Sequence, residues 1–106
     1  MKTSELTGAA LDWAVAKCEG LHREDTIWEI WASTHQYSTD WALGGPIIER
    51  ESINLNKEHD GIHAVIMEPH GHDWTEIVGS TPLIAAMRCY VDSKLGDEVE
   101  VPVELA

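Results

Sequence analysis

Two histidines in the second half of the chain have a spacing that suits metal binding. His70 and His72 lie two residues apart in the segment 68–73 (Glu-Pro-His-Gly-His-Asp), and residues two apart in an extended backbone point to the same side. Imidazole binds zinc and copper, but a zinc site needs three or four protein ligands. A third ligand would have to come from His59, His63 or a distant carboxylate. A polar loop that contains histidine is the simpler interpretation, so we predict no metal and no cofactor.

A second group holds the residue types of a hydrolase triad. Ser38, Thr39 and Asp40 follow closely after His35. The Gly-x-Ser-x-Gly turn that exposes a nucleophilic serine does not occur in the sequence. Hydroxyls and carboxylates that cluster in a loop serve more often as turn and cap residues. We therefore predict a protein without enzymatic activity.

The run Gly44-Gly45-Pro46 could cradle an anion at the start of a short helical turn over 46–50. A phosphate-binding loop needs further glycines and a lysine. The nearby basic residue is Arg50, which lies between two glutamates. An ion pair that fixes the loop is the better interpretation of this arginine.

The segment from Tyr37 to Arg50 has the features of a binding site, because it combines two aromatic residues with a carboxylate and two glycines. Aromatic-rich loops on a rigid scaffold often form binding surfaces. Alternatively, Trp41 and Ile47 fill space against the sheet and the glycines only permit a bend. The sequence does not decide between the two. The candidate binding residues are Tyr37, Ser38, Thr39, Asp40, Trp41, Gly44, Gly45 and Arg50.

Two helices are predicted to support this segment. The first begins after Thr7 and ends at Gly20, with apolar residues at helical spacing. The second is capped by Ser80 or Thr81, starts at Pro82 and ends at Gly96. Its predicted buried stripe is Leu83, Ile84, Met87, Val91 and Leu95, and Arg88, Asp92 and Lys94 are predicted to face outward.

Alternating and β-branched runs predict the remaining elements. Asp60-Gly61 is a hairpin-type turn between two of them, and 32–45 is predicted to be a loop. The predicted strands are 27–31, 52–56, 62–67 and 74–78.

The tail over 97–106 is predicted to be an extended acidic edge strand or arm, because acidic and apolar residues alternate in it. Glu98, Glu100 and Glu104 would then share one face, with about 6.6 Å between residues two apart. Such a row could imitate DNA phosphates toward a DNA-binding protein. A charged edge that prevents aggregation is the alternative, and it requires nothing beyond folding.

Composition limits the class of protein. A chain of 106 residues is one domain over 1–106. Its net charge of −12 repels phosphate, so direct nucleic-acid binding is not expected. Cys18 and Cys89 lie among apolar neighbours and indicate buried thiols in a reducing compartment. Neither a signal peptide nor a membrane span is recognisable, so we expect a cytoplasmic protein.

Three blocks, over 5–17, 37–51 and 81–91, resemble the NinX family of small proteins from the nin region of lambdoid phages and prophages. The blocks occur in the family's order. The resemblance implies a phage accessory protein with no established activity. The family pattern has a glutamine where this chain has Leu43, so a ligand contact made by that glutamine would be missing here.

The sequence therefore predicts an α+β fold in which two helices pack on a small, mostly antiparallel β-sheet. The predicted function is binding of a host or phage protein. The alternative is a small ligand or metal bound by the 37–50 loop or by the 68–73 histidine loop. A further possibility is a homodimer in which Trp28, Trp31 and the tail bury each other.

Overall fold

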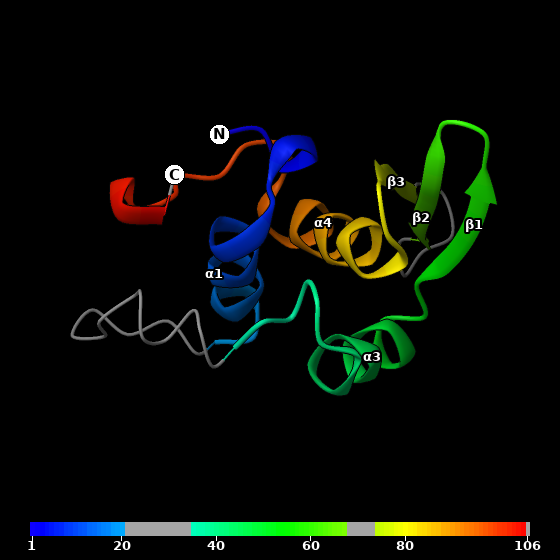
Figure 1. Cartoon of the computed structure of the whole chain (residues 1–106), viewed down its shortest axis with the longest axis horizontal. Coiled ribbons are helices and arrows are strands. Elements are labelled where there is room, and N and C mark those ends of the chain that lie inside the picture. Colours follow the sequence, from blue (N-terminus) through cyan, green and yellow to red (C-terminus); the bar gives the residue numbers. More distant parts are fainter. Residues whose placement is uncertain (21–34, 68–73, 106) are drawn as a thin grey trace.

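The computed structural model in Figure 1 describes residues 1–20, 35–67 and 74–105, without the side chain of Glu104. The predicted strand over 27–31, Trp28, Trp31, His70 and His72 lie outside the described residues. The elements, in chain order, are the 3-10 turn η1 (Thr3–Glu5), α1 (Gly8–Cys18), α3 (Trp41–Arg50), β1 (Asn54–Glu58), β2 (Gly61–Met67), β3 (Trp74–Gly79), α4 (Pro82–Leu95) and η2 (Val103–Leu105).

Helix α4 lies at the centre of the molecule. One side of it packs on β2 and β3, and other sides contact α1 and α3 (Figure 1). A helix with neighbours on several sides must be apolar around most of its circumference. Seven of its residues are accordingly buried: Leu83, Ala85, Ala86, Met87, Cys89, Tyr90 and Val91.

The sheet is antiparallel with strand order β1-β2-β3. Side chains alternate between its two faces, so Ala64, Ile66 and Ile77 are buried on the face that packs against α4. At the end of β3, Gly79 lets the two backbones approach closely. A Cβ there would lie 2.4 Å from the backbone nitrogen of Ala85.

The α+β class is confirmed, but the predicted arrangement of helices is wrong in detail. Three helices are present among the described residues, and α4 is the one that covers the sheet, whereas α1 and α3 pack against α4. The single buried stripe predicted for α4 is also too narrow for this central position. Ile84 and Leu95 are only half-buried, while residues on the flanks of the stripe are fully buried.

Arg88 does not face outward as predicted. Its guanidinium donates hydrogen bonds to the carbonyl oxygens of Leu6 (2.7 Å) and Val78 (3.0 Å). Burial lowers the pKa of this side chain. Arg88 thus joins α4 to the segment before α1 and to β3, because it donates to a carbonyl group of each. Helical periodicity does not reveal this role.

The boundaries of α4 are confirmed. The Thr81 hydroxyl accepts the backbone N–H of Ile84, Pro82 begins the helix, and Gly96 follows its last residue with φ at 90°. Helix α1 also begins after Thr7, and Gly20 beyond its end has φ at 76°. The Thr7 side chain makes no cap hydrogen bond, so the side-chain cap that the sequence predicts is present at α4 but not at α1.

The prediction of a loop over 32–45 is wrong from Trp41 onward, because α3 begins at Trp41 and not at Pro46. The Asp40 carboxylate accepts the N–H of Ala42 (2.9 Å) and so caps the helix. At the other end, Ser52 has φ at 53° and Ile53 donates to the carbonyl of Ile48. Because the helix ends in this way, β1 begins at Asn54, two residues after its predicted start at residue 52.

The hairpin between β1 and β2 is confirmed, but its turn lies one residue earlier than the predicted Asp60-Gly61. Its loop is His59–Asp60, Glu58 pairs with Gly61, and Gly61 has φ at 137°.

The tail does not form the predicted strand. Its pairing is with the N-terminus, through one antiparallel bridge between Lys2 and Glu98 and through two hydrogen bonds between Met1 and Val99. Val99 is buried, and the chain then ends in η2. Glu98 and Glu100 are exposed, but without a continuous strand the regular row of carboxylates is not formed.

Candidate functional site

The segment that precedes α3 is anchored to α1 by a buried carboxylate. The backbone N–H of Ser38 donates to Asp12 (2.8 Å), and both residues are buried. Burial raises the pKa of Asp12, and its hydrogen bonds with Ser38 lower it. Tyr37, beside this contact, is 6 % exposed. The start of the segment is therefore part of the core and does not form a free loop.

Close packing of α3 against α4 depends on Gly44. A Cβ on Gly44 would lie 2.6 Å from Cδ2 of Leu83 and 2.7 Å from the carbonyl oxygen of Tyr37. Real Cβ atoms essentially never approach other atoms so closely. Gly45, on another side of the helix, has 3.8 Å between its Cβ position and the ring of Trp41. The two glycines thus have different roles, and only Gly44 is required by packing.

The C-terminal end of α3 is held by a second polar cluster. Arg50 donates to Glu19 through both terminal nitrogens (2.6 and 3.1 Å) and to Glu51 (2.9 Å). The Tyr90 hydroxyl in α4 donates to Glu19 (2.5 Å) and accepts from Arg50 (3.1 Å). The predicted ion pair of Arg50 is present, but Glu19 beyond α1 is its main partner.

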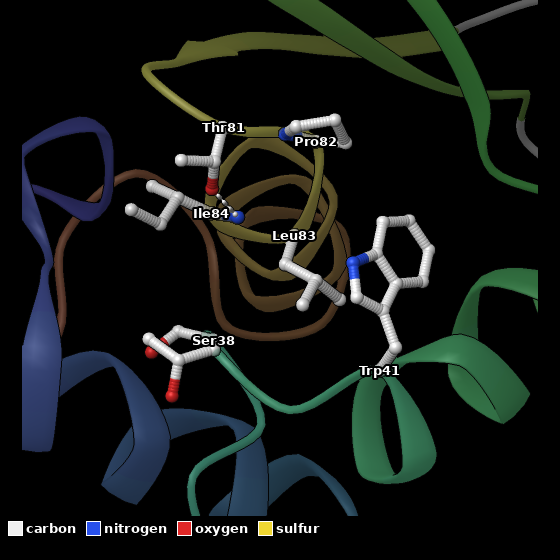
Figure 2. A pocket seen from close by; sticks show the side chains of 7 residues that line it. Ser38, Trp41, Thr81, Pro82, Leu83 and Ile84 are labelled. Carbon is white, nitrogen blue, oxygen red and sulfur yellow. Dashed lines mark hydrogen bonds between the residues drawn. The ribbon is translucent and has the colours of Figure 1, made fainter.

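The segment that begins α3 borders a groove of about 250 Å³. One wall comes from the segment that begins α3 and the other from the first turn of α4; the lining residues are Ser38, Thr39, Trp41, Thr81, Pro82, Leu83 and Ile84. Figure 2 shows the Trp41 indole beside Leu83 and Pro82. Trp41 is 55 % exposed, so a large apolar side chain is held at the groove with much of its surface in water.

The structure brings three of the eight predicted binding residues, Ser38, Thr39 and Trp41, to this groove. Asp40 caps the helix next to Trp41 and is exposed. The other four support the segment from inside or from its ends: Tyr37, Gly44, Gly45 and Arg50. The alternative interpretation is right that Ile47 is buried (2 % exposed), but its helix packs against α4. It is wrong for Trp41, which is exposed.

Hydrolase and phosphate chemistry find no support at this segment. Ser38 is 2 % exposed, and its backbone N–H donates to Asp12. Gly44 and Gly45 lie inside α3, so they do not form a glycine loop at a helix N-terminus.

Several residues of the site were missed by the sequence analysis. Asp12, Glu19 and Tyr90 hold the segment in place, and Pro82 to Ile84 form the second wall of the groove. Asp12, on a helix otherwise rich in buried apolar residues, is the one with a usable signal in the sequence. A carboxylate in such a position needs a hydrogen-bond donor nearby.

A possible metal-binding group lies elsewhere, at the β1–β2 hairpin. Among the described residues, Glu58, Asp60 and His63 offer ligand atoms that all lie within 4.8 Å of one another. The hydrogen bonds of His63 with Asp60 and Glu76 raise its pKa to about 9, and the bond with His63 lowers the pKa of Asp60.

The two cysteines are free thiols. Cys89 is buried as predicted, whereas Cys18 is only half-buried. Burial raises the pKa of Cys18 to about 11 and that of Cys89 to about 12. Both therefore remain protonated at neutral pH, which disfavours a nucleophilic role.

Comparison with known proteins identifies the family. The family model described as bacteriophage P22 NinX matches residues 2–94. The chain belongs to the phage NinX family. The match covers both anchors, α3 and the groove, and it ends within α4. A search of curated proteins found no match to this NinX-family chain. In the described part of the chain, no helix has the length and apolar character needed to cross a membrane.

The anchor at Arg50 should make the stability of this NinX-family protein sensitive to acid. The hydrogen bond from Arg50 lowers the pKa of Glu19. A carboxylate with a lowered pKa in the folded state stabilises the fold above its unfolded pKa, and this contribution is lost as the pH falls through the folded value. We expect the melting temperature to decrease once the pH is lowered below about 4.5, the ordinary pKa of glutamate.

The measurement is thermal unfolding followed by circular dichroism between pH 7 and pH 3, on the wild type and on Glu19→Gln. The variant should be less stable at pH 7 and should lose less stability on acidification. Parallel curves for the two proteins would show that Glu19 is not the responsible group.

Proposed function

We propose that this chain is a non-enzymatic phage accessory protein that binds a host or phage protein through the groove between α3 and α4. The proposal rests above all on Trp41, which is 55 % exposed although the residues on both sides of it along the chain are anchored. Exposed tryptophans on a rigid base are typical of binding hot spots. We further propose that the protein acts in the host cytoplasm, in keeping with its two free thiols.

The occupant that we favour is a short segment of the partner, with one apolar side chain in the groove and basic residues beside it. The groove volume of about 250 Å³ is below the range of about 300–1,000 Å³ of most small-molecule pockets. The net charge of −12 attracts a basic partner. The exposed carboxylate of Asp40 lies next to Trp41 and offers a local partner for a basic residue.

The same charge argues against a homodimer through this surface, because two copies of −12 each repel one another. A small ligand in the groove remains the alternative occupant.

The test is affinity capture from infected host cells with the wild type and two matched variants. Trp41→Ala removes the groove tryptophan, and Trp74→Ala removes another exposed tryptophan (61 %) at the start of β3. We expect one host or phage protein at near-stoichiometric yield, resistant to nuclease. Its affinity for the purified wild type should fall at least about tenfold in Trp41→Ala and stay unchanged in Trp74→Ala.

A photo-reactive residue in place of the exposed Thr39 should then form a cross-link to the same protein. Equal capture by the wild type and by Trp41→Ala would reject the groove as the binding surface. Loss of the captured protein on nuclease treatment would reject direct protein binding. A small molecule that co-purifies with the wild type but not with Trp41→Ala would favour the alternative occupant.

A further inference from the structure

The imidazole of His63 is surrounded by three carboxylates from three parts of the sheet. Its Nε2 lies 2.8 Å from Oδ1 of Asp60 in the hairpin loop and 3.1 Å from Oε2 of Glu58 at the end of β1. Its Nδ1 lies 2.8 Å from Oε2 of Glu76 in β3.

The register of the strands produces this arrangement. Glu58 pairs with Gly61, and Glu76 pairs with Val65, so each glutamate is the diagonal neighbour of His63 on the same face of the sheet. Diagonal neighbours in an antiparallel sheet are within reach of long side chains.

One ring nitrogen is thus shared by two carboxylates. The N–H of an imidazole points along one direction, so a proton on Nε2 forms a good hydrogen bond with only one of Asp60 and Glu58. A metal ion that displaces this proton to the solvent can be coordinated by Nε2 and by an oxygen of each carboxylate at the same time. The second nitrogen, Nδ1, already has Glu76 as its hydrogen-bond acceptor. A carboxylate on the outer nitrogen is the usual way in which proteins orient a metal-binding histidine.

We propose that Glu58, Asp60 and His63 bind one divalent transition-metal ion, and that Glu76 is the positioning residue for His63. One nitrogen and two carboxylate oxygens suit a borderline ion such as zinc, for which imidazole is a preferred ligand. Side chains that are 46 % (Glu58) and 54 % (Asp60) exposed give the ion access from solvent. Three protein ligands leave at least one position for water or for a group of another molecule.

This site is separate from the groove, because the β1–β2 loop projects away from α3 (Figure 1). Its three ligands also differ from the predicted histidine pair: Glu58, Asp60 and His63 belong to the described residues, whereas His70 and His72 lie outside them.

The test uses protein without a polyhistidine tag, titrated with zinc chloride in a calorimeter. The double substitution His70→Ala/His72→Ala serves as the background, so that the second pair of histidines does not contribute. We expect one ion per chain in this background. His63→Ala and Asp60→Asn should each weaken binding at least about tenfold, and Glu76→Gln should weaken it about tenfold with all three ligands kept.

His59→Ala is the matched control. His59 is an exposed histidine in the same loop, but it is not one of the three proposed ligands and is not removed in the background protein. It should bind zinc as the background protein does. Circular dichroism of each variant shows whether the hairpin substitutions leave the fold intact, and Asp60→Asn keeps the test valid if His63→Ala unfolds. Absence of zinc binding in the background protein would overturn the proposal. So would zinc binding that His63→Ala and Asp60→Asn both leave unchanged.

Discussion

The Gly44→Ala substitution should lower the free energy of unfolding by about 2 kcal/mol. Overpacking of a dense core costs up to about 3 kcal/mol, and the better helix propensity of alanine returns about 1 kcal/mol. The Leu83 side chain can rotate away from the new methyl group. The carbonyl of Tyr37 cannot, because the next residue is hydrogen-bonded to Asp12. Helix α3 must then move away from α4, which changes the groove as well as the stability.

Chemical denaturation with a fluorescence readout measures this effect, and Gly45→Ala is the control. A methyl group at residue 45 meets only ordinary contact with the Trp41 ring. Its gain in helix propensity is opposed by the restriction on a residue that precedes proline, so we expect a change below about 1 kcal/mol. If the two variants were equally stable, close packing at Gly44 would not be a determinant of the fold.

The Asp12→Ala substitution should cost about 2 kcal/mol, because it leaves the buried N–H of Ser38 without its acceptor. Asp12→Asn keeps an oxygen in the same place and removes a buried charge. We expect this variant to lie within about 1 kcal/mol of the wild type. The wild type and the asparagine variant both keep the hydrogen bond, and only the wild type has the charge. The comparison therefore separates the contribution of the hydrogen bond to the free energy of unfolding from that of the charge.

The pH dependence of this pair has a definite sign. Burial raises the pKa of Asp12 in the folded state, so the ionised carboxylate costs stability at neutral pH, and this cost disappears as the pH falls. The asparagine variant should gain relative to the wild type at pH 7, and the gain should shrink on acidification. Equal stability of the alanine and asparagine variants would show that the anchor at Ser38 contributes nothing.

The elements that were predicted correctly carry their signals within a few neighbouring residues. The cap at Thr81, the proline after it and Gly96 define α4 from one end to the other. Asp60-Gly61 likewise marks the hairpin, because a residue with positive φ is needed there.

Only the last part of helix α3, the turn over 46–50, was predicted, because the local signals before it oppose a helix. Two glycines and a proline lie inside it, and these are the residues with the lowest helix propensity. The local cap at Asp40 favours the first turn. A contact that only the folded chain provides adds to it, because the absence of a side chain on Gly44 permits close packing on α4. Gly44 thus argues against a helix in the sequence, yet it is the residue that lets this helix pack closely on α4.

The sequence by itself determined the α+β class, the helices around 8–18 and 82–95, the hairpin and the NinX family. It also predicted a binding site in the segment over 37–50. Only the tertiary structure decided which parts of that segment are exposed, that Arg50 binds Glu19 and Tyr90, and that His63 lies among three carboxylates. The reason is physical: caps and turns arise between near neighbours in the chain. A groove, an ion cluster and the exposure of Trp41 arise between segments that meet only when the chain has folded.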